Sequence, residues 1–190
     1  GYIKRTPISE YRTQTRGGVG ANAAKTRDQD FVEHIFVTKT HNYLLLFTAL
    51  GRCHWLRVYE VPKGAKASKG RAIQNLLSLT PGDKIKAYIP IENLKDQAFL
   101  ESHNLIFATK KGIVKKTDIT AYSRPRTNGV NAINIREDDE LLEVKLTDGS
   151  NHILLATREG KSIRFNEKDV RAIGRTGTGV KGINLGSSAD

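Results

Sequence analysis

The chain has 190 residues, of which 31 are Lys or Arg and 20 are Asp or Glu, so its formal net charge is +11. Such an excess of positive charge is typical of proteins that bind nucleic acid. Cys53 is the single cysteine, which excludes an intrachain disulfide and a cysteine metal site and fits a reducing cytoplasm. No apolar run approaches the ~18 residues that span a bilayer, so we expect no membrane partner.

Four pairs of glycines recur along the chain, with a basic stretch inside each pair. The pairs are Gly1 and Gly18, Gly51 and Gly70, Gly112 and Gly129, and Gly160 and Gly179. Acidic residues follow each second glycine, at Asp28 and Asp30, Asp83, Asp138 and Asp139, and Asp190. Self-similarity at a period of ~50 residues indicates one supersecondary unit that is repeated and stacked. We predict repeat units over about 1–43, 44–103, 104–151 and 152–190.

Each unit is predicted to contain about four short strands. Apolar segments precede three turn glycines, over 44–48, 105–109 and 153–157, and indicate a buried strand that enters a hairpin. The following strand alternates apolar and polar residues, and Trp55 in one such strand is expected to pack in the core. Further strands follow the second glycine and the acidic turn. Four strands are the content of one propeller blade, so we predict an all-β, propeller-like fold.

The ends of the chain are out of register with the repeat. Gly1 lacks a preceding strand, Asp190 lacks a following strand, and the sequence contains no methionine. We therefore expect a piece of a longer protein. The interval from Gly51 to Gly112 is also longer than the interval that follows it, and we expect the extra residues, about 90–103, to form a loop on the rim.

The sequence offers no candidate for catalysis or for metal binding. Residues 177–182 match G-x-G-x-x-G, but a dinucleotide site needs a strand before the glycines and a helix after them. Asp138 and Asp139 lie on the repeating turn and are expected to be solvated. The histidines lack metal-ligand spacing and are expected at surface or half-buried positions: His34, His41, His54, His103 and His152. We expect no catalytic residue, no metal and no cofactor in this chain.

A glycine-rich segment after Tyr11 is the most distinctive binding candidate. Its glycines allow backbone amides to approach a polyanion closely, and its arginine can contact a phosphate through two hydrogen bonds. The alternative is a flexible connecting loop. The candidate residues are Gln14, Thr15, Arg16, Gly17, Gly18, Val19 and Gly20.

Basic residues recur on the same strand and loop of each unit and are predicted to form a DNA-binding rim. Bending a duplex costs several kcal/mol, because its persistence length is ~150 base pairs, and a rim with many phosphate contacts can offset that cost. For any single cation the alternative is a merely solvated charge. The predicted set is Lys4, Arg5 and Arg12; Arg57, Lys63, Lys66, Lys69 and Arg71; Lys115, Lys116, Arg124 and Arg126; and Arg164, Arg171, Arg175 and Lys181.

Several segments, in the correct order, resemble the C-terminal domain of bacterial DNA gyrase A. They are residues 1–5, 9–11, 14–20, 70–77, 112–117 and 170–186. The family's box reads Gln, two basic residues, Gly-Gly, a basic residue and Gly. Thr15 and Val19 stand where the family usually has basic residues.

The resemblance implies a β-pinwheel of up to six blades that exchange strands, with about four blades in this chain. It implies that the domain wraps duplex DNA so that ATP-dependent strand passage by the parent enzyme introduces negative supercoils. It also implies the rest of gyrase A, together with gyrase B, as partners in an A2B2 complex, ATP and Mg²⁺ bound elsewhere, a cytoplasmic location and a monomeric isolated domain. The alternatives are the corresponding C-terminal domain of the related topoisomerase IV and a basic propeller that binds an acidic protein.

Overall fold

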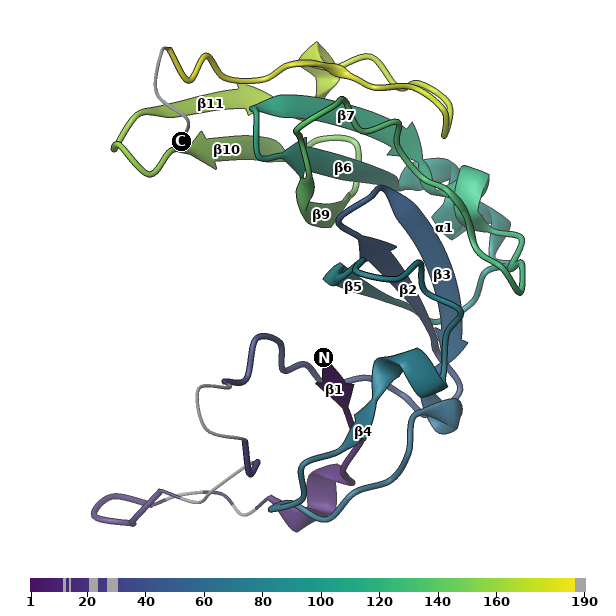
Figure 1. Cartoon of the computed structure of the whole chain (residues 1–190), viewed down its shortest axis with the longest axis vertical. Helices are drawn as coiled ribbons and strands as arrows, with labels where there is room; N and C mark the ends of the chain where they lie inside the picture. Colours follow the sequence, from purple (N-terminus) through teal and green to yellow (C-terminus); the bar gives the residue numbers. More distant parts are fainter. Residues whose placement is uncertain (12, 14, 21–23, 27–30, 187–190) are drawn as a thin grey trace.

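The structure is a computed structural model that describes residues 1–11, 13, 15–20, 24–26 and 31–186. Short antiparallel sheets follow one another along an open arc, from the N-terminal sheet to a C-terminal hairpin (Figure 1). We call each sheet a blade and number the blades in chain order. None of the helices within the described residues could span a membrane. The all-β prediction is confirmed.

The second blade has four strands in the order β5-β2-β3-β8. These are β5 (Ile85–Ile91), β2 (Tyr43–Thr48), β3 (Arg52–Arg57) and β8 (Val130–Asn131). The central hairpin of β2 and β3 and its neighbour β5 come from one repeat unit. The outermost strand, β8, comes from the next unit along the chain and pairs with the start of β3.

The third blade repeats this arrangement in the order β9-β6-β7-β12. Its strands are β9 (Leu141–Thr147), β6 (Asn104–Thr109), β7 (Ile113–Asp118) and β12 (Val180–Lys181). Again the outermost strand, β12, is supplied by the following unit. The exchange of a strand between neighbouring units, which the resemblance implied, is therefore a regular feature of the fold.

The described parts of the first and fourth blades have two strands each. In the first blade β1 (Tyr2–Ile3) pairs with β4 (Arg71–Ala72), which comes from the second unit. In the fourth blade β10 (His152–Ala156) pairs with β11 (Ser162–Asn166). The exchanged strands β4, β8 and β12 lie on the convex side of the arc, whereas β5 and β9 lie on its concave side (Figure 1).

Short helical turns connect the strands. The 3₁₀ turns are η1 (Ile8–Glu10), η2 (Val58–Glu60), η3 (Ile73–Asn75), η4 (Ile119–Tyr122) and η5 (Glu167–Asp169).

The predicted rim loop over about 90–103 is wrong in its interior, because the segment includes the end of β5 and the helix α1 (Gln97–Ser102). The side chain of Asp96 caps α1 by accepting a hydrogen bond from Phe99 N at 3.2 Å, and Leu100 anchors the helix in the core.

The main core lies between the second and third blades. Phe47 of β2 meets Phe107 of β6 edge to face, with ring centroids 5.4 Å apart, and it also contacts Tyr122 at 5.7 Å. Trp55 packs against this core, as predicted, and its indole N–H donates to Tyr122 O at 2.9 Å. Smaller clusters join the first blade to the second and the third to the fourth. Each core therefore holds two neighbouring blades together.

Five of the eight recurring glycines lie where an exchanged strand crosses the preceding blade: Gly51, Gly70, Gly112, Gly129 and Gly179. Gly51 has φ +84°, and a Cβ there would lie 2.4 Å from the carbonyl oxygen of Ile133. Gly179 has φ +98°, and a Cβ there would lie 2.4 Å from Val114 O. Both positions need a residue that adopts positive φ and carries no side chain. This close backbone approach explains the glycine pairs of the second and third units, Gly51 with Gly70 and Gly112 with Gly129.

We predict that Gly179→Ala destabilises the chain far more than Gly149→Ala. Gly149 has a similar φ of +93° but no heavy atom near its missing Cβ, so alanine there suffers only backbone strain of about 1–2 kcal/mol. At position 179 the collision with Val114 O adds to that strain, for a total loss above about 3 kcal/mol. Urea unfolding monitored by circular dichroism measures both losses. Equal losses would contradict the account of the crossing.

Candidate nucleic-acid interface

The loops that lead into β4, β8 and β12 carry most of the exposed cations of the predicted rim. These loops, over 62–70, 123–129 and 171–179, lie on the convex side of the arc (Figure 1). The predicted rim and box cations with exposed side chains are Arg16, Lys63, Lys69, Arg71, Arg124, Arg126, Arg164, Arg171 and Lys181.

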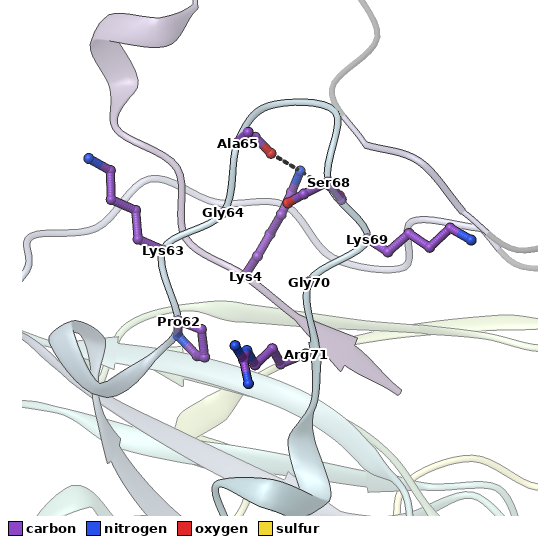
Figure 2. A pocket seen from close by; sticks show the side chains of 9 residues that line it. All are labelled: Lys4, Pro62, Lys63, Gly64, Ala65, Ser68, Lys69, Gly70 and Arg71. Carbon is purple, nitrogen blue, oxygen red and sulfur yellow. Dashed lines mark hydrogen bonds between the residues drawn. The ribbon is translucent and has the colours of Figure 1, made fainter.

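The loop over 62–70 forms a shallow basic cavity of about 310 Å³ (Figure 2). A turn folds the loop on itself, with Ser68 N donating to Ala65 O at 2.9 Å. Lys63 and Lys69 point away from each other on its two sides (Figure 2). The ammonium group of Lys66 lies over the ring of Tyr11, 4.9 Å from its centroid. The loop therefore offers two splayed ammonium groups to a ligand on the convex side.

Lys4 lies beneath this loop and holds it rather than facing outward. Its Nζ donates to Ala65 O at 3.0 Å, to Lys66 O at 2.6 Å and to Ser68 O at 2.9 Å. Burial lowers the pKa of this ammonium group. The prediction of Lys4 as a phosphate contact is wrong, because its three N–H groups are directed at three carbonyls of the chain itself.

Lys115 is the clearest correction to the predicted rim. Its side chain is 0% exposed, and its Nζ donates to Ala132 O at 2.6 Å and to Arg175 O at 2.8 Å. Burial, followed by the positive charge of Arg175, lowers the pKa of Lys115 to about 8. The ammonium group also lies 5.3 Å from the ring centroid of Phe107. A side chain enclosed in this way cannot contact DNA.

Four further predicted cations are half-buried and donate to main-chain carbonyls. Their acceptors lie in the next unit, the preceding loop or the neighbouring blade. A phosphate contact by these residues stays a prediction. The bonds are Arg5 Nε to Val61 O at 2.8 Å, Arg57 Nη1 to His41 O at 2.9 Å, Lys116 Nζ to Glu167 O at 2.8 Å and Arg175 Nη1 to Asn131 O at 3.4 Å.

The box forms an exposed turn in its described part. Gly18 N donates to Thr15 O at 3.1 Å, and Gly17 has φ +79°, which places Arg16 at the corner of the turn. Val19 and Gly20 are exposed as well. Two predicted residues, Gln14 of the box and Arg12 of the rim, lie outside the described residues. The DNA-binding role of the box stays a prediction.

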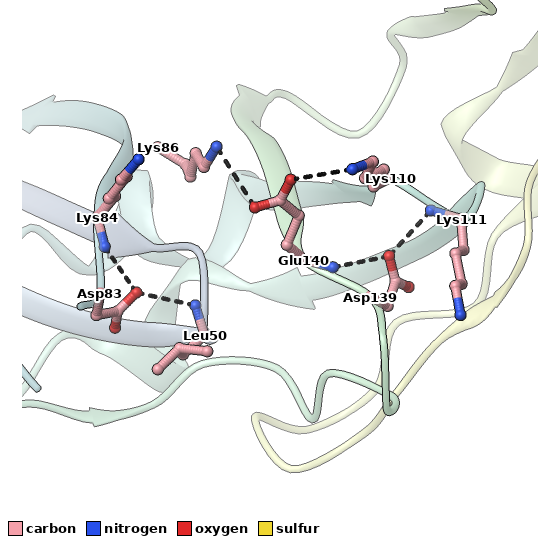
Figure 3. Close-up of polar contacts among 8 residues, drawn as sticks. All are labelled: Leu50, Asp83, Lys84, Lys86, Lys110, Lys111, Asp139 and Glu140. Atoms are coloured by element: carbon pink, nitrogen blue, oxygen red, sulfur yellow. Dashed lines mark hydrogen bonds and ion pairs between the residues drawn. The ribbon is translucent and has the colours of Figure 1, made fainter. Parts of the chain in front are cut away.

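The recurring acids close hairpin turns (Figure 3). Asp83 Oδ1 accepts hydrogen bonds from Leu50 N at 3.1 Å and from Lys84 N at 2.9 Å. In the next unit Asp139 Oδ1 accepts from Lys111 N at 2.9 Å and from Glu140 N at 2.8 Å. Asp138 is exposed and Asp139 is partly exposed, as expected for acids on a turn, and the Asp139 carboxylate in addition holds its turn through these bonds.

Glu140 links the second and third blades at this edge (Figure 3). Its carboxylate lies 3.7 Å from Lys86 Nζ of β5 and 3.7 Å from Lys110 Nζ. The surface around Glu140 therefore carries both acids and lysines, whereas cations predominate on the outer loops. Among the described residues no three His, Cys, Asp or Glu side chains are grouped so that they could hold a metal ion.

Comparisons with solved structures define the class of protein. The chain superposes on the C-terminal domain of DNA topoisomerase IV with a TM-score of 0.78 and 31% identity, covering 99% of this chain and 55% of that one. It superposes on a DNA gyrase A C-terminal domain with a TM-score of 0.75 and 23% identity, covering 99% and 59%. The fold is therefore the β-pinwheel of the C-terminal domains of these topoisomerases.

Sequence comparison gives the family. The family model of the DNA gyrase C-terminal domain, beta-propeller, matches residues 1–39, 42–91, 103–148 and 151–188. DNA gyrase A of Haemophilus influenzae is 43% identical over 190 residues, and that of Halalkalibacterium halodurans is 47% identical over 184 residues. These alignments cover 100% and 97% of the chain but 21% and 22% of the relatives. The chain belongs to the DNA gyrase C-terminal domain family and spans about a fifth of such relatives.

We predict that charge reversal on the outer loop weakens DNA binding more than an equal reversal elsewhere. Lys63→Glu, Lys69→Glu and Arg71→Glu together should raise the Kd for duplex DNA about 100-fold, because they remove phosphate contacts and add repulsion. The matched control is Lys84→Glu, Lys95→Glu and Lys145→Glu, which changes the net charge equally. Fluorescence anisotropy should show a far smaller effect for the control, and equal effects would contradict the interface.

We predict that raising the pH stabilises the wild type relative to Lys115→Met. The pKa of Lys115 is about 8 in the folded chain and 10.5 in its ordinary state, so between these values the unfolded chain binds more protons. Stability then rises with pH, and the full shift corresponds to about 3 kcal/mol. Urea unfolding of both proteins at pH 7.5, 9 and 10.5 measures the difference. A difference that stays flat or falls would contradict the buried ammonium group.

Proposed function

We propose that the chain binds duplex DNA along the convex side of its arc and bends the duplex around it. The observation that carries the proposal is the set of exposed cations on successive outer loops and on the strands that follow them: Lys63, Lys69 and Arg71; Arg124 and Arg126; and Arg171 with Lys181. Because the blades turn steadily along the arc, a duplex that contacts several loops in succession has to curve. Membership of the DNA gyrase C-terminal domain family supports the same conclusion.

The energetics favour a wrap over a straight contact only if many phosphates are bound. Bending a site of 20–30 base pairs by 40–90° costs on the order of 1–6 kcal/mol. Each phosphate contact releases condensed counterions, so several loops acting together can offset this cost. Residues 1–71 contain 13 basic and 5 acidic side chains, whereas residues 72–157 contain 11 of each. We infer that the first two blades contribute more of the electrostatic attraction.

In the whole enzyme the wrap is proposed to present a distal DNA segment for strand passage, so that DNA gyrase introduces negative supercoils. The proposed partners are duplex DNA, the remainder of gyrase A, and gyrase B, in an A2B2 complex in the cytoplasm. ATP and Mg²⁺ are proposed to bind elsewhere in that complex. The isolated domain is proposed to be monomeric.

We predict that binding is insensitive to base sequence and steeply dependent on salt. With about 6–10 phosphate contacts, affinity should fall by ~10³–10⁵ between 50 and 200 mM salt. Affinity should also rise with duplex length until the rim is filled. Anisotropy titrations with duplexes of several lengths and unrelated sequences measure both trends. Two results together would favour an acidic protein partner instead. Polyglutamate would compete as well as DNA does, and the affinity for DNA would not change with duplex length.

We predict that the box controls the bend more than the affinity. Gln14→Ala, Arg16→Ala, Gly17→Ala and Gly18→Ala together remove one arginine among many cations but alter the turn that carries it. Short duplexes should still bind, while the full enzyme should lose supercoiling and keep ATP-dependent relaxation. Lys25→Ala with Thr26→Ala, which are exposed and lie just after the box, provide the control. A correctly folded box variant that supercoils normally would exclude this role.

A further inference from the structure

We propose that Lys4 and Lys115 are positioning residues, which hold the DNA-facing loops of the following units in the shape that directs their cations outward. The effect on DNA binding rests on the proposed function, whereas the hydrogen bonds between the lysines and the loops do not depend on it. Lys4 acts on the loop over 62–70, and Lys115 acts on the loop over 171–179.

The two lysines occupy the same place in the repeat. Lys4 is the third residue after Gly1, and Lys115 is the third residue after Gly112. Each Nζ reaches the carbonyl of the residue four positions before the next unit's second glycine. This carbonyl belongs to Lys66 in one case, at 2.6 Å, and to Arg175 in the other, at 2.8 Å. The same long-range contact made twice indicates a built feature of the fold.

The residue after each lysine fastens the same loop at its other end. Arg5 donates from Nε to Val61 O at 2.8 Å, and its backbone N–H donates to Pro62 O at 3.1 Å. Gly64 N donates back to Arg5 O at 3.0 Å. Lys116 plays the same part in the third blade, where Ile173 N donates to its carbonyl at 2.9 Å. Each loop is therefore attached to the preceding blade at both ends.

An ammonium group suits this position because a tight loop turns several carbonyls to one side. Lys4 satisfies three of them at once, which no apolar side chain can do. With its carbonyls directed inward, the loop projects Lys63 and Lys69 to its outer sides (Figure 2). The inner lysine thereby acts on DNA through the loop and not by contact.

The second blade is a natural comparison, because histidine stands at the same place. His54 is the third residue after Gly51; it is 3% exposed, and its Nδ1 has no hydrogen-bond partner within the described part of the chain. The loop over 123–129 is held instead by Arg52, whose guanidinium donates to Asn128 O at 2.8 Å. This loop therefore lacks the inner ammonium group.

The test compares Lys4→Met with Lys69→Met in the 190-residue chain. Lys69→Met removes one outward ammonium group, so the slope of log K against log salt should fall by about 0.9, with no change in loop exchange. Lys4→Met should speed hydrogen exchange at Gly64 and Ser68 at least ~10-fold without DNA, which corresponds to about 1.4 kcal/mol of lost loop stability. Lys4→Met should also lower the slope of log K against log salt by more than about 0.9, the value for one phosphate contact. The reason is that several cations of the loop are displaced at once. Lys4→Arg should restore part of the slow hydrogen exchange and part of the salt slope.

The proposal is overturned if Lys4→Met folds, leaves exchange over 62–70 unchanged and lowers the salt slope by one contact, as Lys69→Met does. If the wild-type chain fails to bind duplex DNA, the proposed function fails, whereas exchange measured without DNA still decides whether Lys4 holds the loop.

A gain-of-function variant keeps the test decisive if Lys4→Met does not fold. His54→Lys places an ammonium group under the loop over 123–129. Lysine fits beside the corresponding glycine in the other blades, where Lys4 lies against Gly70 and Lys115 lies against Gly179. Exchange at Gly129 N, which donates to Arg126 O at 3.0 Å, should slow, and DNA affinity should rise more than in the control Leu142→Lys on the concave strand β9. Unchanged exchange at Gly129, with equal gains in affinity from both lysines, overturns the proposal.

Discussion

The arc depends on a backbone crossing that occurs in the first three sheets, where the outermost strand arrives from the following repeat unit. At this crossing Gly51 O accepts from Ala132 N at 2.8 Å, and Gly112 O accepts from Gly182 N at the same distance. Glycines permit the approach, since any side chain at Gly51 or Gly179 would meet a carbonyl oxygen. Each of the first three blades is thereby hydrogen-bonded to a strand that continues toward the next blade. The loop before that strand is carried to the convex side.

The basic residues serve two purposes that sequence composition does not separate. Cations on the strand after the first glycine, such as Lys4 and Lys115, turn toward carbonyls at the junction of two blades. Cations on the following loop, such as Lys63 and Lys69, face solvent. The inner lysine occurs in two units, whereas exposed cations occur on three successive outer loops. The candidate DNA interface therefore contains fewer residues than the full set of basic residues. The remaining cations, such as Lys4 and Lys115, bind carbonyls of the chain itself.

Much of the fold could be predicted from the sequence, because glycine spacing and apolar strands are local signals. The hairpins before Gly51 and Gly112 and the packing of Trp55 followed from them. The inward direction of Lys115 could not be predicted, because it depends on a carbonyl 60 residues away in the sequence. The helix α1 was missed although Asp96 is a cap, since six residues carry little periodicity. The role of Asp139 as a turn acceptor likewise needs the three-dimensional pairing.

The central proposal is that successive loops on the convex side of the arc wrap DNA with one hand, as the proposed introduction of negative supercoils requires. The most direct measurement incubates the chain with relaxed circular DNA and a nicking-closing enzyme, removes the protein and resolves the topoisomers. The account predicts a shift in linking number that grows with protein concentration. The shift should be lost with Lys63→Glu, Lys69→Glu and Arg71→Glu and kept with Lys84→Glu, Lys95→Glu and Lys145→Glu. An unchanged linking number at saturating protein, or an equal shift for both triple variants, would contradict it.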